Sequence, residues 1–217
     1  RLKGPIGKQD QYIAAYGGFR FMEFMPDETV RVDPLIFPEE AAAKLHARLL
    51  LLYTGVTRRA GPLLRRFRAR FSVQAEVMGR LRALAEQTRR DLQDGRIDGL
   101  GELLHEGWAA KKSVVGGVSN GPIDHAYDAA RKAGAVGGKI LGAGGGGFLL
   151  LFCSPRKRAA VTTALKATAE PNCTVKTPLL TATPFCVSAQ SSVPDVGKSN
   201  IRKVISKLPL RGLLAVS

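Results

Sequence analysis

The sequence predicts an α+β fold in which strands and helices form a split βαβ arrangement. Two continuous apolar runs, at residues 48–53 and 148–153, have the length and composition of buried strands. The segment between them shows helical periodicity and ends in a shorter strand at residues 138–141. A further helix follows the second run, because Ser154 and Pro155 form a common helix start. The resulting order is strand, helices, strand, strand and helix, with a final strand left open after Pro171, where the pattern degrades; this is the order of a split βαβ unit.

The region before residue 48 is predicted to contain one helix and two strands. Residues 10–16 form the helix, because a pair of glycines follows and glycine commonly ends helices. Apolar residues predict strands at 19–24 and 30–37, with a proline-containing turn between them. Residues 38–40 are interpreted as a short connector or a domain boundary.

Three helices are predicted between the two apolar runs. In residues 61–93, apolar side chains recur every three, four or seven positions, and arginines occupy the other face. A glycine-containing break at 95–99 separates this helix from a second one that starts at Leu100. Ser119 or Asn120 caps the third helix. The stripe that faces the core in the first helix consists of Leu64, Phe67, Phe71, Met78, Leu81 and Ala85.

Composition excludes several classes of protein. The 217 residues are 45% apolar and 24% charged, which excludes a disordered chain. No apolar run reaches about 18 residues, so no membrane span is predicted. The cysteines and histidines lie singly, without the spacing of a zinc site or a disulfide framework, and this is typical of a reducing cytoplasm.

The net charge of +15 raises the question of nucleic-acid binding. Many of the arginines fall on the outer face of residues 61–93, and aromatic residues make up only 6% of the chain. Arginine-rich helix faces are usually solvated surface, so specific nucleic-acid binding is not predicted. A small anionic substrate fits the charge equally well.

Residues 142–147 hold five glycines in six positions and lead directly into the apolar run at 148–153. A glycine backbone can approach a ligand closely, and successive N–H groups can point at an anion. The run matches the dinucleotide fingerprint literally, but that fingerprint opens a helix and here a strand follows. A Walker A loop is excluded because Ile140, not serine or threonine, follows Lys139. The structural alternative is a tight hairpin that packs against a helix.

Residues 137–151, which contain this glycine run, resemble the third signature motif of the GHMP small-molecule kinases. Within that family the chain resembles the D-glycero-D-manno-heptose 7-phosphate kinase branch. The other segments that agree follow one another in the order of the family; they are residues 7–12 with 16–18, 52–58, 103–108 with 111–112, and 119–120 with 123–124.

The resemblance implies the two-domain GHMP kinase fold. Residues 1–38 are then the C-terminal remnant of the N-terminal kinase domain. Residues 39–175 are the C-terminal domain, a ferredoxin-like split βαβ unit with extra helices. Residues 176–217 contain stretches rich in Ser, Thr and Pro and are predicted to be a divergent or poorly ordered tail.

The resemblance also implies an activity, the ATP-dependent phosphorylation of a sugar hydroxyl. The expected acceptor is the anomeric hydroxyl of D-glycero-D-manno-heptose 7-phosphate, on a route to GDP- or ADP-heptose and to surface glycans such as lipopolysaccharide. ATP with Mg²⁺ is the expected donor, the cytoplasm the expected compartment, and a homodimer is compatible with the family. Two alternatives stay open: a galactokinase- or fucokinase-like GHMP kinase, and a non-catalytic binding module that lacks the ATP loop.

Particular residues acquire roles through the same resemblance. Asp10 is the predicted catalytic residue, because the family has a carboxylate here that lies near the acceptor hydroxyl and is able to accept its proton. The predicted phosphate-side loop is Gly142, Ala143, Gly144, Gly145, Gly146 and Gly147, with N–H groups of residues 144–147 stabilising phosphate charge. The predicted substrate-binding residues are Gln11, Tyr16, Gly17, Thr54 and Arg58.

Two of these residues have a structural alternative. Asp10 is of a type that often caps a helix N-terminus. Arg58 suits a phosphate group because of its forked guanidinium, but it is equally typical of a solvated arginine at a helix start.

The sequence departs from the family at its main ATP loop, a glycine- and serine-rich segment that is not found before Asp10. No metal ligand is therefore assigned within this chain, and the Mg²⁺ ligands are expected in a missing N-terminal part. The chain alone is predicted to be inactive.

Overall fold

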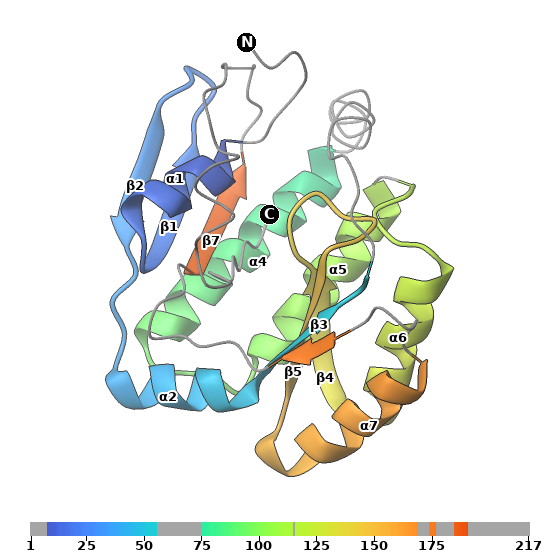
Figure 1. Cartoon of the computed structure of the whole chain (residues 1–217). Coiled ribbons are helices and arrows are strands. Elements are labelled where there is room, and N and C mark those ends of the chain that lie inside the picture. Colours follow the sequence, from blue (N-terminus) through green and yellow to red (C-terminus); the bar gives the residue numbers. More distant parts are fainter. Residues whose placement is uncertain (1–7, 56–74, 115, 169–173, 177–184, 191–217) are drawn as a thin grey trace.

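The computed structural model describes residues 8–55, 75–114, 116–168, 174–176 and 185–190 (Figure 1). The helices are α1 (Gln9–Tyr16), α2 (Glu39–Arg48), α4 (Ala75–Gln93), α5 (Leu100–Val114), α6 (Gly121–Lys132) and α7 (Arg158–Thr168), with a 3-10 turn at Pro155–Lys157. The strands are β1 (Phe19–Phe24), β2 (Val30–Pro34), β3 (Leu49–Tyr53), β4 (Ala135–Ile140), β5 (Phe148–Cys153), β6 (Thr174–Lys176) and β7 (Phe185–Gln190). None of the described helices is long and apolar enough to span a membrane.

The larger sheet has the strand order β4-β5-β3-β6, and each neighbouring pair is antiparallel. Strands β3 and β4 therefore run in the same direction, with β5 inserted between them. This is the split βαβ topology that a ferredoxin-like unit requires. Helices α4, α5 and α6 all lie in the connection from β3 to β4, and α7 lies in the connection from β5 to β6. The predicted α+β fold with extra helices is confirmed.

Both faces of this sheet are buried, which explains why β3 and β5 are continuously apolar. Leu49 and Leu51 belong to a core with residues of α2, α4 and the first half of α5. Leu50 and Leu52 point to the opposite face and join a second core formed mainly with α6 and α7. Successive side chains of a strand alternate between faces, so a sheet covered on both sides needs apolar residues at every position.

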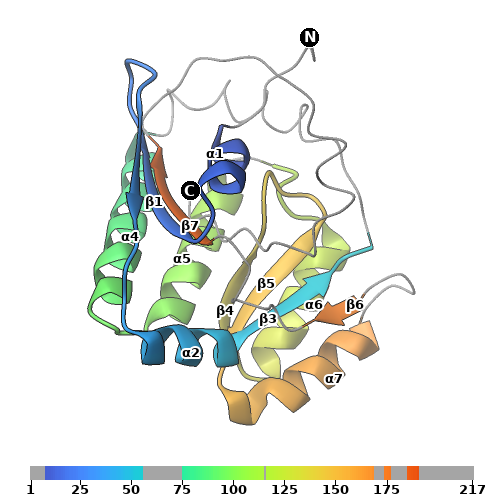
Figure 2. The same cartoon turned by 60° about the vertical axis from the view of Figure 1, so that its left-hand side comes forward.

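A smaller sheet of order β2-β1-β7 lies beyond α4 and α5 (Figure 2). Strand β7 pairs in parallel with β1, Phe19 lying opposite Phe185. No strand is predicted from the sequence at 185–190, a range within the predicted tail. The part of that tail after residue 190 lies outside the described residues, and the domain limits at 38 and 175 stay predictions.

Helix α2 is the clearest difference from the sequence prediction, since residues 38–40 were expected to be a connector. The helix starts directly after Pro38 and buries Ala41 and Leu45, one turn apart. Its C-terminal carbonyls are satisfied by Arg158, whose guanidinium donates to the oxygens of Ala47 at 2.6 Å and Leu49 at 2.9 Å. A cation at this end also complements the helix dipole.

Smaller differences concern the ends of elements. Strand β2 stops at Pro34 and not at residue 37, and β4 begins at Ala135 and not at residue 138. The predicted helix at 61–93 is described only from Ala75, and its earlier part lies outside the described residues. Asn120, and not Ser119, caps α6: its side-chain oxygen accepts a hydrogen bond from the backbone N–H of Ile123 at 3.0 Å.

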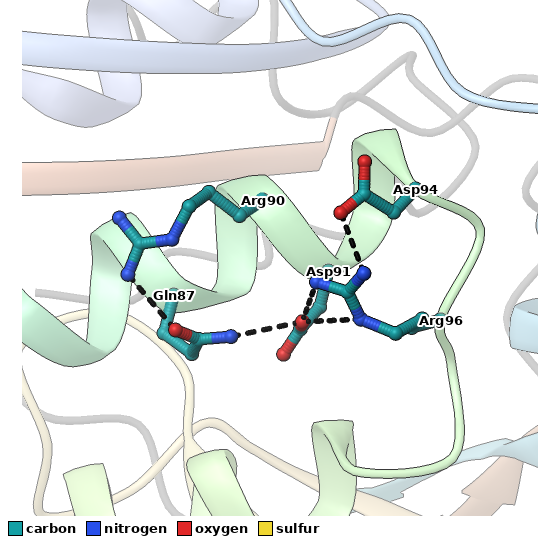
Figure 3. A network of polar contacts seen from close by, with 5 residues as sticks. All are labelled: Gln87, Arg90, Asp91, Asp94 and Arg96. Carbon is teal, nitrogen blue, oxygen red and sulfur yellow. Dashed lines mark hydrogen bonds and ion pairs between the residues drawn. The ribbon is translucent and has the colours of Figure 1, made fainter.

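The end of α4 carries a network of polar contacts around Arg96, whose side chain is 57% exposed (Figure 3). Arg96 forms ion pairs with Asp91 at 2.7 Å and with Asp94 at 2.6 Å. Gln87 extends the network, because it donates to Asp91 at 2.9 Å and accepts from Arg90 at 2.8 Å. The contacts hold the turn that follows the helix.

Candidate active site at the glycine loop

The glycine loop, residues 141–147, closes the hairpin between β4 and β5. Its ends are joined by a hydrogen bond from the Leu141 N–H to the Phe148 carbonyl at 2.8 Å. Gly142, Gly144, Gly145 and Gly147 all have positive φ angles, of 72°, 109°, 76° and 88°. Side chains rarely adopt this conformation, so the backbone path itself requires glycine at these four positions.

The connection from α5 to α6 contacts the middle of the loop. The Gly145 N–H donates to the carbonyl of Val118 at 2.7 Å, and the Asn120 side-chain amide donates to the carbonyl of Gly145 at 3.4 Å. A Cβ atom on Gly144 would lie 2.8 Å from the Val118 oxygen. The loop is therefore packed against another element. The N–H of Gly145, predicted among those that stabilise phosphate charge, is already engaged within the protein.

Thr54 holds the other end of the loop. Its backbone N–H and its hydroxyl both donate to the carbonyl of Gly147, each at 2.9 Å. The side chain is buried. The structure thus gives Thr54 a role in positioning the loop, while its predicted contact with the substrate stays a prediction.

Lys111 of α5 lies beneath the start of the loop. Its side chain is only 6% exposed, and its ammonium donates to the carbonyl of Gly142 at 3.0 Å. The close packing of α5 against β4 explains this position: a Cβ atom on Gly137 would lie 1.9 Å from the carbonyl oxygen of Gly101. From that contact, ten residues of α5 advance about 15 Å to Lys111, while three residues of β4 and two of the loop lead to Gly142, and the two residues meet there.

Asp10 lies in the first turn of α1 and interacts electrostatically with Lys111. Lys8 occupies the capping position of α1, so the interpretation of Asp10 as the helix cap is wrong. The residue is exposed, and yet desolvation by the surrounding protein raises the pKa of its carboxyl, with the charge of Lys111 acting in the opposite direction. Burial in turn lowers the pKa of Lys111 to about 8, while Asp10 opposes that shift. A ligand can therefore reach Asp10, in surroundings that already disfavour its charge.

Residues 81–170 match the family model described as GHMP kinases C terminal. The chain contains the C-terminal domain of a GHMP kinase. A D-glycero-alpha-D-manno-heptose 7-phosphate kinase from Campylobacter jejuni is 34% identical over 162 residues, which are 74% of this chain and 48% of that protein. The resemblance carried by the motifs is confirmed.

Two solved GHMP kinase structures show the same fold. A D-glycero-D-manno-heptose 1-phosphate kinase from Bacteroides thetaiotaomicron has a TM-score of 0.57 and 30% identity, covering 81% of this chain and 46% of its own. The mevalonate kinase of L. major, in complex with R-mevalonate, has a TM-score of 0.54 over 67% of this chain and 44% of its own. At 24% identity its likeness concerns the fold alone. The chain spans about half the length of these relatives.

Three of the other predicted site residues, Gln11, Tyr16 and Gly17, lie on α1 or directly after it. The side-chain oxygen of Gln11 is buried and has no hydrogen-bond partner among the described residues, as expected of an acceptor that a ligand hydroxyl would satisfy. Tyr16 is 54% exposed and stacks on Tyr12, and Gly17 ends the helix with a φ of 64°. Arg58 lies outside the described residues.

The sequence prediction did not single out Lys111 as a site residue, although it lies in one of the matching segments. The spacing of apolar residues in α5 could have indicated that Lys111 is buried. Leu100, Leu104 and Trp108 form the buried stripe of this helix, and Lys111 follows on the same stripe three residues later. A lysine on the apolar stripe of a helix is unusual, because lysine is almost never fully buried without a partner. No group of three or more His, Cys, Asp or Glu side chains suited to a metal occurs in the described part of the chain.

Proposed function

We propose that the full-length protein transfers the γ-phosphoryl group of Mg-ATP to the anomeric hydroxyl of D-glycero-D-manno-heptose 7-phosphate. The observation that supports this best is that Lys111 hydrogen-bonds the glycine loop at Gly142 and also acts electrostatically on Asp10. The relative from Campylobacter jejuni, named for that reaction, covers most of this chain. Such a product would serve the synthesis of nucleotide-activated heptose.

The chemistry assigned to this chain is proton transfer and charge positioning. The sugar hydroxyl oxygen forms a bond to the γ-phosphorus, the bond from that phosphorus to the ADP oxygen breaks, and the hydroxyl proton passes to Asp10. The raised pKa of Asp10 makes its carboxylate a stronger base than an ordinary aspartate. The backbone of the glycine loop would lie close to the transferred phosphate and donate hydrogen bonds to it. The N–H of Gly145 is not one of these donors, because it already donates to the carbonyl of Val118.

ATP and Mg²⁺ are treated as co-substrates. The described residues offer Mg²⁺ no cluster of ligands, and the proposal assigns none of them to it. Phosphoryl transfer places most of the catalytic demand on positioning and on electrostatic stabilisation, which the loop and the Asp10–Lys111 pair are suited to supply.

The test is ADP release by the full-length protein with heptose 7-phosphate, compared with unphosphorylated heptose, galactose and fucose. Heptose 7-phosphate is expected to give the highest kcat/KM. Asp10→Asn should lower kcat about 10²- to 10⁴-fold, which is the usual contribution of general-base catalysis. Asp128→Asn removes the same charge from an exposed position on α6 and should leave turnover unchanged. Full turnover by Asp10→Asn would remove Asp10 from the mechanism, and preference for another sugar would replace the substrate.

A further inference from the structure

The buried ammonium of Lys111 calls for an explanation that packing does not supply. Leu104, Trp108 and Val114 lie on the same buried stripe of α5 and are at most 3% exposed. An ammonium has three N–H donors. Gly142 accepts one of them at 3.0 Å, and a carbonyl does not neutralise a charge.

The charge of Lys111 is unfavourable for folding. Desolvation is the larger influence on its pKa, which falls to about 8, and the attraction of Asp10 recovers only part of that shift. Replacing buried charges by apolar residues of similar size is often neutral or stabilising. A role in stability therefore does not account for the ammonium, and both its hydrogen bond to Gly142 and its electrostatic interaction with Asp10 belong to the candidate active site.

We propose that Lys111 is a positioning residue of the kinase site, whose single buried charge fixes the start of the glycine loop at Gly142 and keeps Asp10 ionised as the base. This inference rests on the proposed function. It assigns to α5 the task of coupling the residue that accepts the proton to the loop that lies beside the phosphate.

The hydrogen bond and the electrostatic interaction act on different steps. The hydrogen bond to Gly142 holds a backbone carbonyl whose residue has a φ of 72°, and so maintains the path of the loop. The Coulomb attraction favours the carboxylate form of Asp10 against the desolvation that favours the neutral acid. Among the described residues, Asp10 is the charged group that acts on the pKa of Lys111. The neighbouring Lys112 is engaged with Asp124 of α6 at 3.1 Å.

The first experiment measures the Asp10 carboxyl pKa by ¹³C NMR in the full-length protein, with the signal assigned from Asp10→Asn. Lys111→Met should raise that pKa, because the carboxylate loses its positive neighbour. Lys44→Met makes the same change at an exposed position on α2 and should leave it unchanged. An unchanged Asp10 pKa in Lys111→Met would overturn the proposal. This readout does not depend on turnover, so it separates the role of Lys111 from the identity of the substrate.

The second experiment separates the charge from the hydrogen bond. Lys111→Gln keeps an N–H donor for Gly142 without the charge, and Lys111→Met removes both. Both variants should shift the acid limb of the kcat–pH profile to higher pH, since both raise the Asp10 pKa. Lys111→Met should lower kcat about 10- to 100-fold and more than Lys111→Gln, because it also frees the loop.

A purely structural lysine gives a different pattern. Its replacement would lower the melting temperature and leave the acid limb of the profile in place, and that result would refute the positioning role. If either variant fails to fold, the other still yields the Asp10 pKa and the profile. If the wild-type protein phosphorylates no sugar while Lys111→Met still raises the Asp10 pKa, the proposed function fails and the coupling stands.

Discussion

Two clusters of charge in this chain differ in burial and, as a result, in what their charges do. At the end of α4, Arg96 pairs with Asp91 and Asp94 at 2.7 and 2.6 Å, and its side chain is 57% exposed (Figure 3). At the glycine loop, Lys111 is 6% exposed and hydrogen-bonds one carbonyl. Arg96 has more and shorter ionic contacts, but water screens them, and exposed ion pairs usually contribute little to stability.

The difference shows that counting ion pairs does not identify the important charge. In the network at the end of α4, Arg96 and Asp94 are more than half exposed, so water hydrates these two ions with or without their partners, and only Asp91 is largely covered. At the loop the protein has removed water from the ammonium of Lys111, and desolvation also acts on Asp10 although that residue is exposed, so each charge alters the pKa of the other. Electrostatic interactions between groups that are shielded from water can shift pKa values, and shifted pKa values are typical of catalytic sites.

The largest effect is expected from Gly144→Ala in the buried loop. The new Cβ atom would meet the Val118 carbonyl oxygen at 2.8 Å, and the residue has a φ of 109°, so overlap and backbone strain combine. We expect a loss of about 4 kcal/mol in the free energy of unfolding, measured by urea denaturation. Gly95→Ala, beside the exposed network, is the matched control. There φ is 71° but the nearest atom lies at 3.6 Å, so strain alone should cost about 1 to 2 kcal/mol. Equal losses at the two positions would contradict the claim that the loop is packed tightly.

The next effect concerns the pH dependence of stability. The pKa of Lys111 is lower in the folded protein, about 8, than the ordinary lysine value of 10.5. Between these values the unfolded chain binds more protons, so stability should rise with pH through this window. Relative to Lys111→Met, the wild-type protein should gain roughly 3 kcal/mol from pH 7.5 to pH 10.5. Comparison of the two proteins by urea denaturation isolates this residue, because other groups titrate in both. A difference that is constant with pH would show that Lys111 is not buried as a cation.

The sequence predicted the larger sheet well and the smaller one less well, for a physical reason. Strands β3 and β5 are buried on both faces, so their own composition identifies them. Strand β7 forms by pairing with β1, which lies more than 160 residues earlier in the chain. The residues around β7 do not by themselves indicate that such a partner strand exists. Helix α2 was missed because only Ala41 and Leu45 are buried in it, which is too short a pattern to separate from a connector.

The site was predictable to the same extent. The glycines of the loop could be recognised because positive φ angles restrict residue type. Asp10 was found through the resemblance and not through its own surroundings. Lys111 was not predicted as a site residue, because its burial depends on how closely α5 approaches β4. That distance is set by Gly101 and Gly137, which lie in different parts of the chain. Electrostatic coupling between distant segments is a property of the folded structure.

The smallest effect is expected from Arg96→Ala, which removes both ion pairs of the exposed network at once. Because Arg96 and Asp94 are more than half exposed and Gln87 still donates to the less exposed Asp91, the melting temperature should stay within about 2 °C of the wild-type value. The remaining difference should shrink in 0.5 M NaCl, since salt screens surface charges. In an NMR titration of both variants, Lys111→Met should change the Asp10 pKa although it removes only one charge, whereas Arg96→Ala should not. A large, salt-insensitive loss of stability in Arg96→Ala would mean that the turn after α4 depends on these pairs, and exposure would then not be what separates the two clusters.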